Sequence, residues 1–305
     1  MRIQHTRASV RVPATSANLG PGFDALGLAV DLCDDLELEA TTGGVEITAR
    51  GEGAGSVPTG EEHLVVRALR RGLDEAGAPQ VGVRLQCTNR IPHGRGMGSS
   101  AAATVAGLLL ARALVGEPEA LDDRTVLQLA CEFEGHPDNA APALMGGVVL
   151  SWMRGGHARA VALTVAEDVL RPLVLLPRTT LSTHVARSLL PETVPYGDAV
   201  HNASRTALLI HALSTGDSDL LLEATEDRLH QEHRAPGMPQ SVELMRVLRQ
   251  EGVPAVISGA GPAVLVLAGD RARVAGLVRR IVDDPSAWRL AQVPLRRHPS
   301  RAVVG

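Results

Sequence analysis

Hydrophobic and polar residues alternate in several short segments of the first half of the chain, a pattern typical of half-buried strands. It predicts strands at 8–14, 35–41, 45–51, 81–89 and 147–153. We expect the segments 35–41 and 45–51 to pair antiparallel. Apolar residues spaced three and four apart predict helices at 61–77, 99–115 and 123–132. Small and polar residues predict a long loop at 15–27, and 134–147 fits a loop or a short helix.

The pattern starts again at about residue 165. Helices are predicted at 182–190, 196–214, 217–231, 239–251 and 270–284, and strands at 171–177 and 288–296. The segment 254–269 fits two apolar strands joined by a glycine-rich turn. Because runs of strands precede runs of helices, the fold class expected is α+β rather than a doubly wound sheet. We expect two domains, residues 1–165 and 166–305.

Composition removes several classes of function. The chain has 305 residues, 45% of them hydrophobic, which is enough for a large core or two ordinary domains. Its net charge is −4, with acids and bases mixed, so the charge pattern argues against a nucleic-acid surface. Aromatic residues make up 2%, which leaves no stacking platform for single-stranded nucleic acid.

The usage of lysine and cysteine narrows the chemistry further. All 30 basic residues are arginine, which excludes a Walker lysine, a Schiff base and a lysine general base. Cys33, Cys87 and Cys131 are far apart and lack CxxC spacing, which argues against a zinc site or a disulfide framework. The opening residues lack the apolar run of a signal peptide, and no apolar run reaches the roughly 18 residues of a membrane span. We therefore expect a cytoplasmic protein that does not bind membranes.

The glycine-rich segment PHGRGMGSSAAA (92–103) leads directly into the predicted helix 99–115. It lacks the lysine of a GxxxxGK[ST] P-loop, the third glycine of a GxGxxG fingerprint and the GxSxG of an esterase elbow. Gly94, Gly96 and Gly98 allow positive φ, and a helix start offers free N–H groups and a partial positive charge. An anion site and a capped helix after a tight turn both fit this pattern.

Several segments together resemble the GHMP small-molecule kinases. The loop PHGRGMGSSAAA resembles the family's PxxxGxGSSAA signature, and EGHPDNAAPALMGG (134–147) and SGAGPAVLVL (258–267) stand where two further family motifs occur. The segments VPATSANLGPGFDALGLAV (12–30), STHVARSLLP (182–191) and EDRLHQEHRAPGMP (226–239) resemble the members that phosphorylate L-homoserine. The resemblance covers nearly the whole chain.

This resemblance implies a two-domain GHMP kinase fold. Its N-terminal domain carries the glycine loop and the following helix, its C-terminal domain is ferredoxin-like, and the active site lies between them. It also implies ATP as phosphoryl donor, Mg²⁺ as cofactor and the side-chain hydroxyl of L-homoserine as acceptor, in threonine biosynthesis. A homodimer is the oligomeric state that the family suggests.

The resemblance assigns ATP to the glycine loop. The residues expected to bind it are Pro92, Gly94, Arg95, Gly96, Met97, Gly98, Ser99, Ser100, Ala101 and Ala102. Ser99 and Glu134 would hold Mg²⁺, because the metal prefers oxygen ligands. Glu132 is a nearby alternative to Glu134.

The resemblance also assigns the amino-acid acceptor. Asn18 and Asp24 would bind its ammonium group, and Arg187 and Arg234 its carboxylate, since arginine suits planar bidentate binding. Thr183, His136 and Gly259 would line the substrate, and Asp138 and Asn139 are the catalytic candidates. Whether Asp138 acts as a true general base stays open, because phosphoryl transfer depends mainly on positioning and charge neutralisation.

Two other functions remain open from the sequence. One is a related kinase of another small alcohol, such as mevalonate, which carries a carboxylate but no ammonium group. The other is a non-catalytic ligand-binding protein on the same scaffold. The pair Asn18 and Asp24 argues against the first, and the presence of Ser99 and Glu134 argues against the second.

Overall fold

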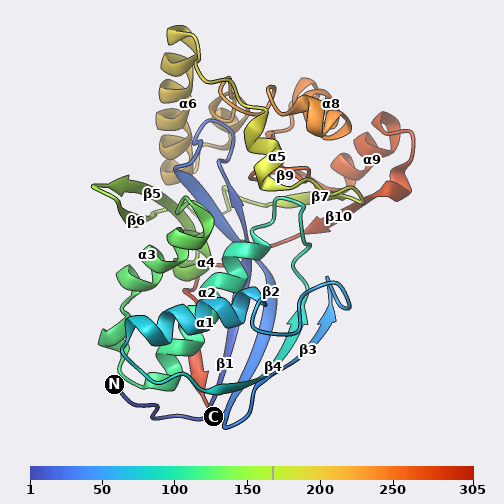
Figure 1. The fold of residues 1–305 in the computed structure, drawn as a ribbon. Helices are drawn as coiled ribbons and strands as arrows, with labels where there is room; N and C mark the ends of the chain where they lie inside the picture. The colour runs from blue at the N-terminus through green and yellow to red at the C-terminus, as the bar shows by residue number, and fades with distance from the viewer. Residues whose placement is uncertain (167) are drawn as a thin grey trace.

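A mixed sheet organises the first half of the chain in the structure, a computed structural model that describes residues 1–166 and 168–305 (Figure 1). Its main path runs β11–β1–β2–β4–β3, and β5 pairs with β2 and with β6. The strands are β1 (Arg7–Ala17), β2 (Leu26–Thr41), β3 (Val45–Gly51), β4 (Gly82–Asn89), β5 (Val148–Arg154), β6 (His157–Leu163) and β11 (Ala302–Val304).

The pairing predicted for 35–41 and 45–51 is wrong. Strand β4 lies between β2 and β3, and β3 pairs with it in parallel, with Val45 opposite Val83. Burial explains this order, because the inward residues of β4 are fully buried whereas β3 is only half-buried. A half-buried strand suits the edge of a sheet, and a strand with a fully buried face suits a central place.

Helices of the first half cover one face of this sheet. They are α1 (Leu64–Glu75), α2 (Ser99–Val115), α3 (Asp123–Glu134) and α4 (Ala140–Met145), with a short 3-10 turn at Pro118–Leu121. Helix α2 is buried along most of its length because it contacts α1, α3, α4 and strand β1. The glycine-rich segment therefore ends in the best-packed helix of this half, which holds the loop in place.

A second, antiparallel sheet organises the rest of the chain, in the order β10–β7–β9–β8. Its strands are β7 (Leu173–Pro177), β8 (Ala255–Ile257), β9 (Val264–Val266) and β10 (Trp288–Gln292). The helices are α5 (Thr183–Ser188), α6 (Tyr196–Thr215), α7 (Leu221–Ala224), α8 (Pro239–Gln250) and α9 (Arg271–Ile281). Short 3-10 turns occur at Ser218–Leu220, Ala235–Gly237 and Pro285–Ala287.

The helix predicted at 217–231 is wrong beyond residue 224. The Thr225 hydroxyl donates back to the carbonyls of Leu221 and Leu222, and the Asp227 carboxylate accepts backbone N–H groups from residues 229–231. These side chains satisfy backbone groups that a continuing helix would need, so the segment forms turns. The turns bring this segment to the loop between β1 and β2, where His230 Nε2 lies 2.8 Å from the Gly20 carbonyl oxygen.

The two halves meet at the β1–β2 loop. This loop is shorter than predicted, since β1 continues to Ala17 and β2 begins at Leu26. In Figure 1 it rises among the helices of the second half, and the Pro21 carbonyl accepts hydrogen bonds from Asn202 and Thr206 of α6. The C-terminal strand β11 returns to pair with β1. The division into residues 1–165 and 166–305 stays a proposal, and β11 lies outside the second sheet.

Within the described residues, no helix combines the length and the apolar character needed to cross a membrane.

Candidate active site

The glycine loop between β4 and α2 needs glycine at three positions. Gly94, Gly96 and Gly98 have φ values of 62°, 73° and 66°, as predicted, in the left-handed region that favours glycine. A Cβ on Gly96 would lie 2.1 Å from the Ser258 carbonyl oxygen, and one on Gly98 would lie 1.9 Å from Thr15 Oγ1. Gly98 is the N-cap of α2 and has no side chain with which to cap the first-turn N–H groups. The start of α2 can therefore offer them to an anion.

The glycine turn of residues 258–263 packs against this loop. As predicted, it joins two apolar strands, β8 and β9. The Ser258 hydroxyl lies 2.6 Å from the Gly96 carbonyl oxygen and 2.8 Å from Ser16 Oγ. The Gly259 carbonyl oxygen accepts hydrogen bonds from Asn18 and Arg234. The turn thus connects the glycine loop to residues expected at the acceptor site.

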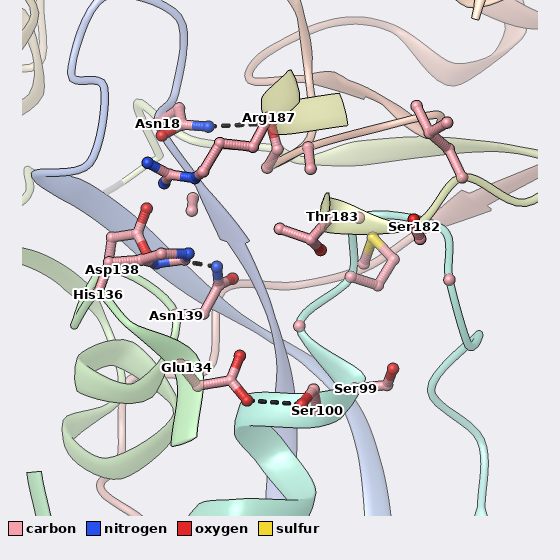
Figure 2. Close-up of a pocket in the computed structure, with 18 of the residues that line it drawn as sticks. Asn18, Ser99, Ser100, Glu134, His136, Asp138, Asn139, Ser182, Thr183 and Arg187 are labelled. Atoms are coloured by element: carbon pink, nitrogen blue, oxygen red, sulfur yellow. Dashed lines mark hydrogen bonds and ion pairs between the residues drawn. The ribbon is translucent and has the colours of Figure 1, made fainter. Parts of the chain in front are cut away.

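A cavity of about 330 Å³ opens between these segments (Figure 2). The predicted site residues that line it are Asn18, Asp24, Gly94, Gly96, Met97, Gly98, Ser99, Ser100, Glu134, His136, Asp138, Asn139, Thr183, Arg187, Arg234 and Gly259. Phe133, Leu181 and Ser182 also line it, and sequence reasoning missed them. Residues that are more than 200 positions apart in the chain, such as Asn18 and Gly259, therefore line the same cavity.

Four of the residues expected to bind ATP lie outside this cavity. Ala101 and Ala102 are fully buried. Pro92 and Arg95 line a separate surface hollow, where Arg95 Nε donates to the Pro177 carbonyl oxygen at 3.0 Å. The Arg95 guanidinium also lies 3.7 Å from the Glu52 carboxylate. The Arg95 side chain thus turns away from the cavity and connects the glycine loop to the end of β7.

Glu134 faces the start of α2 at one end of the cavity. Its Oε1 accepts a hydrogen bond of 2.5 Å from the hydroxyl of Ser100, and Figure 2 shows Ser99 turned away from it. Burial raises the pKa of the Glu134 carboxyl, and the Ser100 hydrogen bond opposes this shift. Glu132 instead pairs with Arg71 on the surface at 3.2 Å. The hydroxyl that pairs with the Glu134 carboxylate is thus that of Ser100, whereas the resemblance assigned Ser99 to the metal together with Glu134.

Charged groups gather at the other end of the cavity. Arg187 forms a bidentate pair with Asp24, at 2.7 and 3.1 Å. Asn18 is buried between them and the glycine turn, where its Oδ1 accepts from the Asp24 N–H and its Nδ2 donates to the Gly259 carbonyl. Arg234 is 2% exposed, and its Nε is buried without a hydrogen-bond partner among the described residues. This end therefore presents both a carboxylate and two guanidinium groups.

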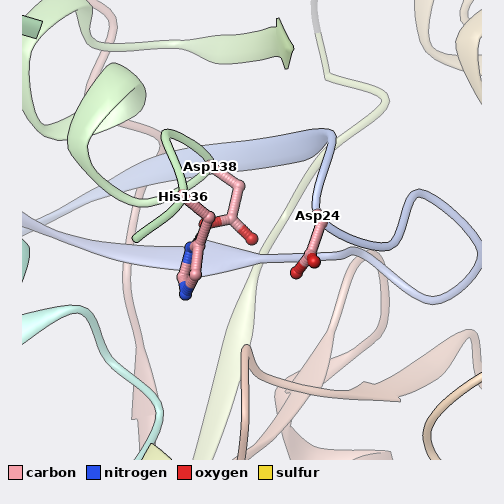
Figure 3. A group of neighbouring side chains, drawn as sticks. All are labelled: Asp24, His136 and Asp138. Atoms are coloured by element: carbon pink, nitrogen blue, oxygen red, sulfur yellow. Dashed lines mark hydrogen bonds and ion pairs between the residues drawn. The ribbon is translucent and has the colours of Figure 1, made fainter. Parts of the chain in front are cut away.

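Asp138 lies between the two ends and is 1% exposed. It contacts His136 Nδ1 closely, and Asn139 Nδ2 lies 3.4 Å from its Oδ1. Burial lowers the pKa of His136, but the hydrogen bond and charge of Asp138 outweigh it and leave the pKa raised. Figure 3 shows Asp24 facing this pair, with donor atoms of all three residues within 4.8 Å. Since Asp24 pairs with Arg187 and Asp138 with His136, the cluster is a network of paired charges.

Comparisons with known proteins identify the family of this chain. The model of the GHMP kinases N terminal domain matches residues 63–147, and that of the GHMP kinases C terminal region matches residues 209–284. The homoserine kinase of Streptomyces avermitilis is 53% identical over 273 residues, which span 88% of this chain and 89% of that protein. The chain belongs to the homoserine kinase family.

Solved structures support this membership of the homoserine kinase family. Homoserine kinase from Cytophaga hutchinsonii superposes with a TM-score of 0.84 at 27% identity, over 98% of both chains. Mevalonate diphosphate decarboxylase from Enterococcus faecalis shares the fold, with a TM-score of 0.69 at 15% identity over 98% of this chain and 99% of that one. The expected two-domain α+β GHMP kinase fold is thereby confirmed, and membership of a kinase family confirms ATP as the phosphoryl donor.

A second pocket adjoins the cavity at the start of α2. Ser99 and Ser100 line both pockets. Its volume is about 260 Å³, and its walls are mostly apolar. They include Leu36, Val57, Pro58, His63, Leu64, Val65, Cys87 and Ala103. Sequence reasoning named none of these wall residues as binding residues. The signal was present in part, since Leu36 and Cys87 are inward positions of predicted strands that lie opposite one another beside the glycine loop.

Proposed function

We propose that this cavity transfers the γ-phosphoryl group of ATP to the side-chain hydroxyl of L-homoserine. The observation that carries the proposal is the arrangement of two sites in one cavity. An anion-binding helix start lies at one end, and Asp24 with Arg187 and Arg234 lies at the other. Homoserine is a zwitterion with a short hydroxyl arm, so its charged end and its reacting end match the two ends of the cavity.

The acceptor's charges have complementary partners in this geometry. The ammonium group would bind the Asp24 carboxylate and the free lone pair of Asn18 Oδ1. The carboxylate would bind Arg187 and the Nε side of Arg234. A buried donor without an acceptor costs free energy, so the orphaned Arg234 Nε favours an anionic ligand at this point. Mevalonate lacks the ammonium group that Asp24 would bind.

The donor would lie along the glycine loop, with its base in the apolar second pocket and its phosphates at the start of α2. The Ser100 hydroxyl and the Glu134 carboxylate fit Mg²⁺, because both offer oxygen ligands and they are already neighbours at the start of α2. Bound there, the metal would neutralise charge on the phosphates. Ser100 and Glu134 would hold it at the junction of the two pockets, and α2 would orient the phosphate chain.

The catalytic roles proposed for Asp138 and Asn139 are those of orienting groups. Asp138 is already bonded to His136, and Asn139 Oδ1 accepts a 2.8 Å hydrogen bond from Thr15. Asn139 would orient the hydroxyl or the γ-phosphoryl group. Phosphoryl transfer makes a small demand on a base, so we expect Asp138→Asn to retain measurable turnover. A loss as large as that of Glu134→Gln would contradict this part of the proposal.

A coupled ADP-release assay with Mg·ATP and L-homoserine tests the proposal. We expect turnover that depends on L-homoserine, and Arg187→Ala should raise the KM for L-homoserine while leaving the KM for ATP nearly unchanged. Mevalonate and a sugar alcohol serve as competing acceptors in the same assay. The assignment would be overturned if mevalonate were phosphorylated faster than L-homoserine. It would also be overturned if ATP were hydrolysed at a rate that does not depend on any acceptor. The homodimer and the cytoplasmic location stay predictions, and light scattering tests the first.

A further inference from the structure

His230 lies next to the end of the cavity that is lined by Asp24, Arg187 and Arg234, but it does not line the cavity itself. Its side chain is fully buried, in the turns that follow α7. Its Nε2 lies 2.8 Å from the Gly20 carbonyl oxygen, and its Nδ1 lies 3.1 Å from Arg234 Nη1. Its ring stacks on Phe23, with centroids 5.0 Å apart and planes 18° apart. The imidazole therefore contacts both the β1–β2 loop and the buried arginine.

The partners of His230 determine its protonation state. A carbonyl oxygen can only accept, so Nε2 must carry a proton to bond to Gly20. A guanidinium can only donate, so Nδ1 must be bare to accept from Arg234. The contacts thus require a neutral imidazole in the Nε2–H tautomer. A second proton would place two donors and two positive charges face to face.

The charges around His230 are consistent with a neutral ring. Burial lowers its pKa below the ordinary 6.5, Arg234 lowers it further, and Asp227 and Asp24 act in the opposite direction. Asp227 Oδ2 lies 3.7 Å from Nε2 but accepts backbone N–H groups of its own turn. Asp227 therefore builds the turn that presents the imidazole.

We propose that His230 is a positioning residue, which holds Arg234 and the β1–β2 loop in the geometry that receives the acceptor's carboxylate and ammonium groups. Nη1 of Arg234 is shared between His230 and the Gly259 carbonyl, so the Nε side of the guanidinium remains for the ligand. The guanidinium carbons of Arg187 and Arg234 lie 5.8 and 5.5 Å from the centroid of the Phe23 ring, and the His230 ring stacks on the same Phe23 ring. This proposal rests on the proposed function, because it needs an amino-acid acceptor.

Two amide variants separate the two contacts of His230. Asparagine places its amide oxygen near the position of Nδ1 and can still accept from Arg234, whereas glutamine places its amide nitrogen near Nε2 and can still donate to Gly20. We expect H230Q to raise the KM for L-homoserine about tenfold or more, since tenfold is the lower end of the loss expected for one hydrogen bond to a charged group. H230N should raise it less than about threefold. The KM for ATP and kcat should change by less than about twofold in both, because neither contact touches the donor site.

An acceptor without the carboxylate distinguishes a specific loss of carboxylate binding from a general loosening of the acceptor site. The wild-type enzyme should prefer L-homoserine over 3-amino-1-propanol, which lacks only that group. H230Q should reduce this preference about tenfold, since its effect passes through Arg234. Equal losses for both acceptors, equal effects of H230N and H230Q, or a matched rise in the KM for ATP would overturn the proposal. Failure of the wild-type protein to phosphorylate L-homoserine would instead refute the proposed function, and thermal unfolding of each variant confirms that it is folded.

Discussion

Replacing Asp24 by asparagine tests the acceptor site most directly. The change removes the charge expected to bind the ammonium group and keeps the size of the side chain. Asp24 has φ of 54°, and asparagine tolerates this left-handed conformation, so the backbone should not be strained. A hydrogen bond between charged groups contributes about 1.5–3 kcal/mol, and 1.4 kcal/mol corresponds to a factor of ten. We therefore expect the KM for L-homoserine to rise about 10- to 150-fold.

The fold should tolerate this change. The pair that Asp24 forms with Arg187 has side chains 36% and 44% exposed, and such pairs contribute about 0–1 kcal/mol to stability. The pair of Asp35 with Arg90 offers a matched control, with exposures of 38% and 45% and no place in the cavity. We expect Asp35→Asn to have the same small effect on thermal unfolding and to leave both KM values unchanged.

The assay is ADP release at saturating Mg·ATP with varied L-homoserine, followed by the reverse titration for ATP. Binding of the ammonium group by Asp24 predicts that only the KM for L-homoserine rises in Asp24→Asn. If that KM stays within about twofold of the wild type, the charge of Asp24 does not bind the substrate and our assignment of the ammonium site is wrong. If the KM for ATP rises equally, the residue acts on the whole cavity rather than on the acceptor.

Three further outcomes are expected. Glu134→Gln should lower kcat about 100-fold or more. Glu132→Gln loses only a surface pair with Arg71, so its kcat should stay near that of the wild type. Equal losses of kcat in the two variants would contradict the assignment of the metal to Glu134. Ser100→Ala should raise the Mg²⁺ concentration needed for half-maximal rate about tenfold, whereas Ser99→Ala should change it less; the reverse order would favour the residue that the sequence indicated. Burial raises the pKa of Cys87 to about 12, so at pH 8 only about one thiol in ten thousand is ionised; mass spectrometry should find Cys87 alkylated by iodoacetamide in denaturant and not in the native protein.

Local chemistry explains why much of the fold and site was predictable. Positive φ at Gly94, Gly96 and Gly98 follows from the residue type, and the burial of α2 follows from a run of small and apolar residues. Motif order was enough to name most residues that the structure places around the cavity. The two failures have different causes. The neighbour of 45–51 depends on strand β4, which lies far along the chain. The helix ends at residue 224 because the nearby Thr225 and Asp227 side chains compete for backbone groups.

The sequence by itself determined that a glycine loop precedes a helix, that no lysine takes part, and that acids and arginines recur in segments typical of one kinase family. Only the tertiary structure decided which of these groups meet. Adjacent residues of a helix point about 100° apart, so packing of α2 decides that Ser100, rather than Ser99, faces Glu134. Arg187 reaches Asp24 across 163 positions, and His230 reaches Gly20 across 210. Such contacts depend on how the two sheets and their loops pack, which no local pattern contains.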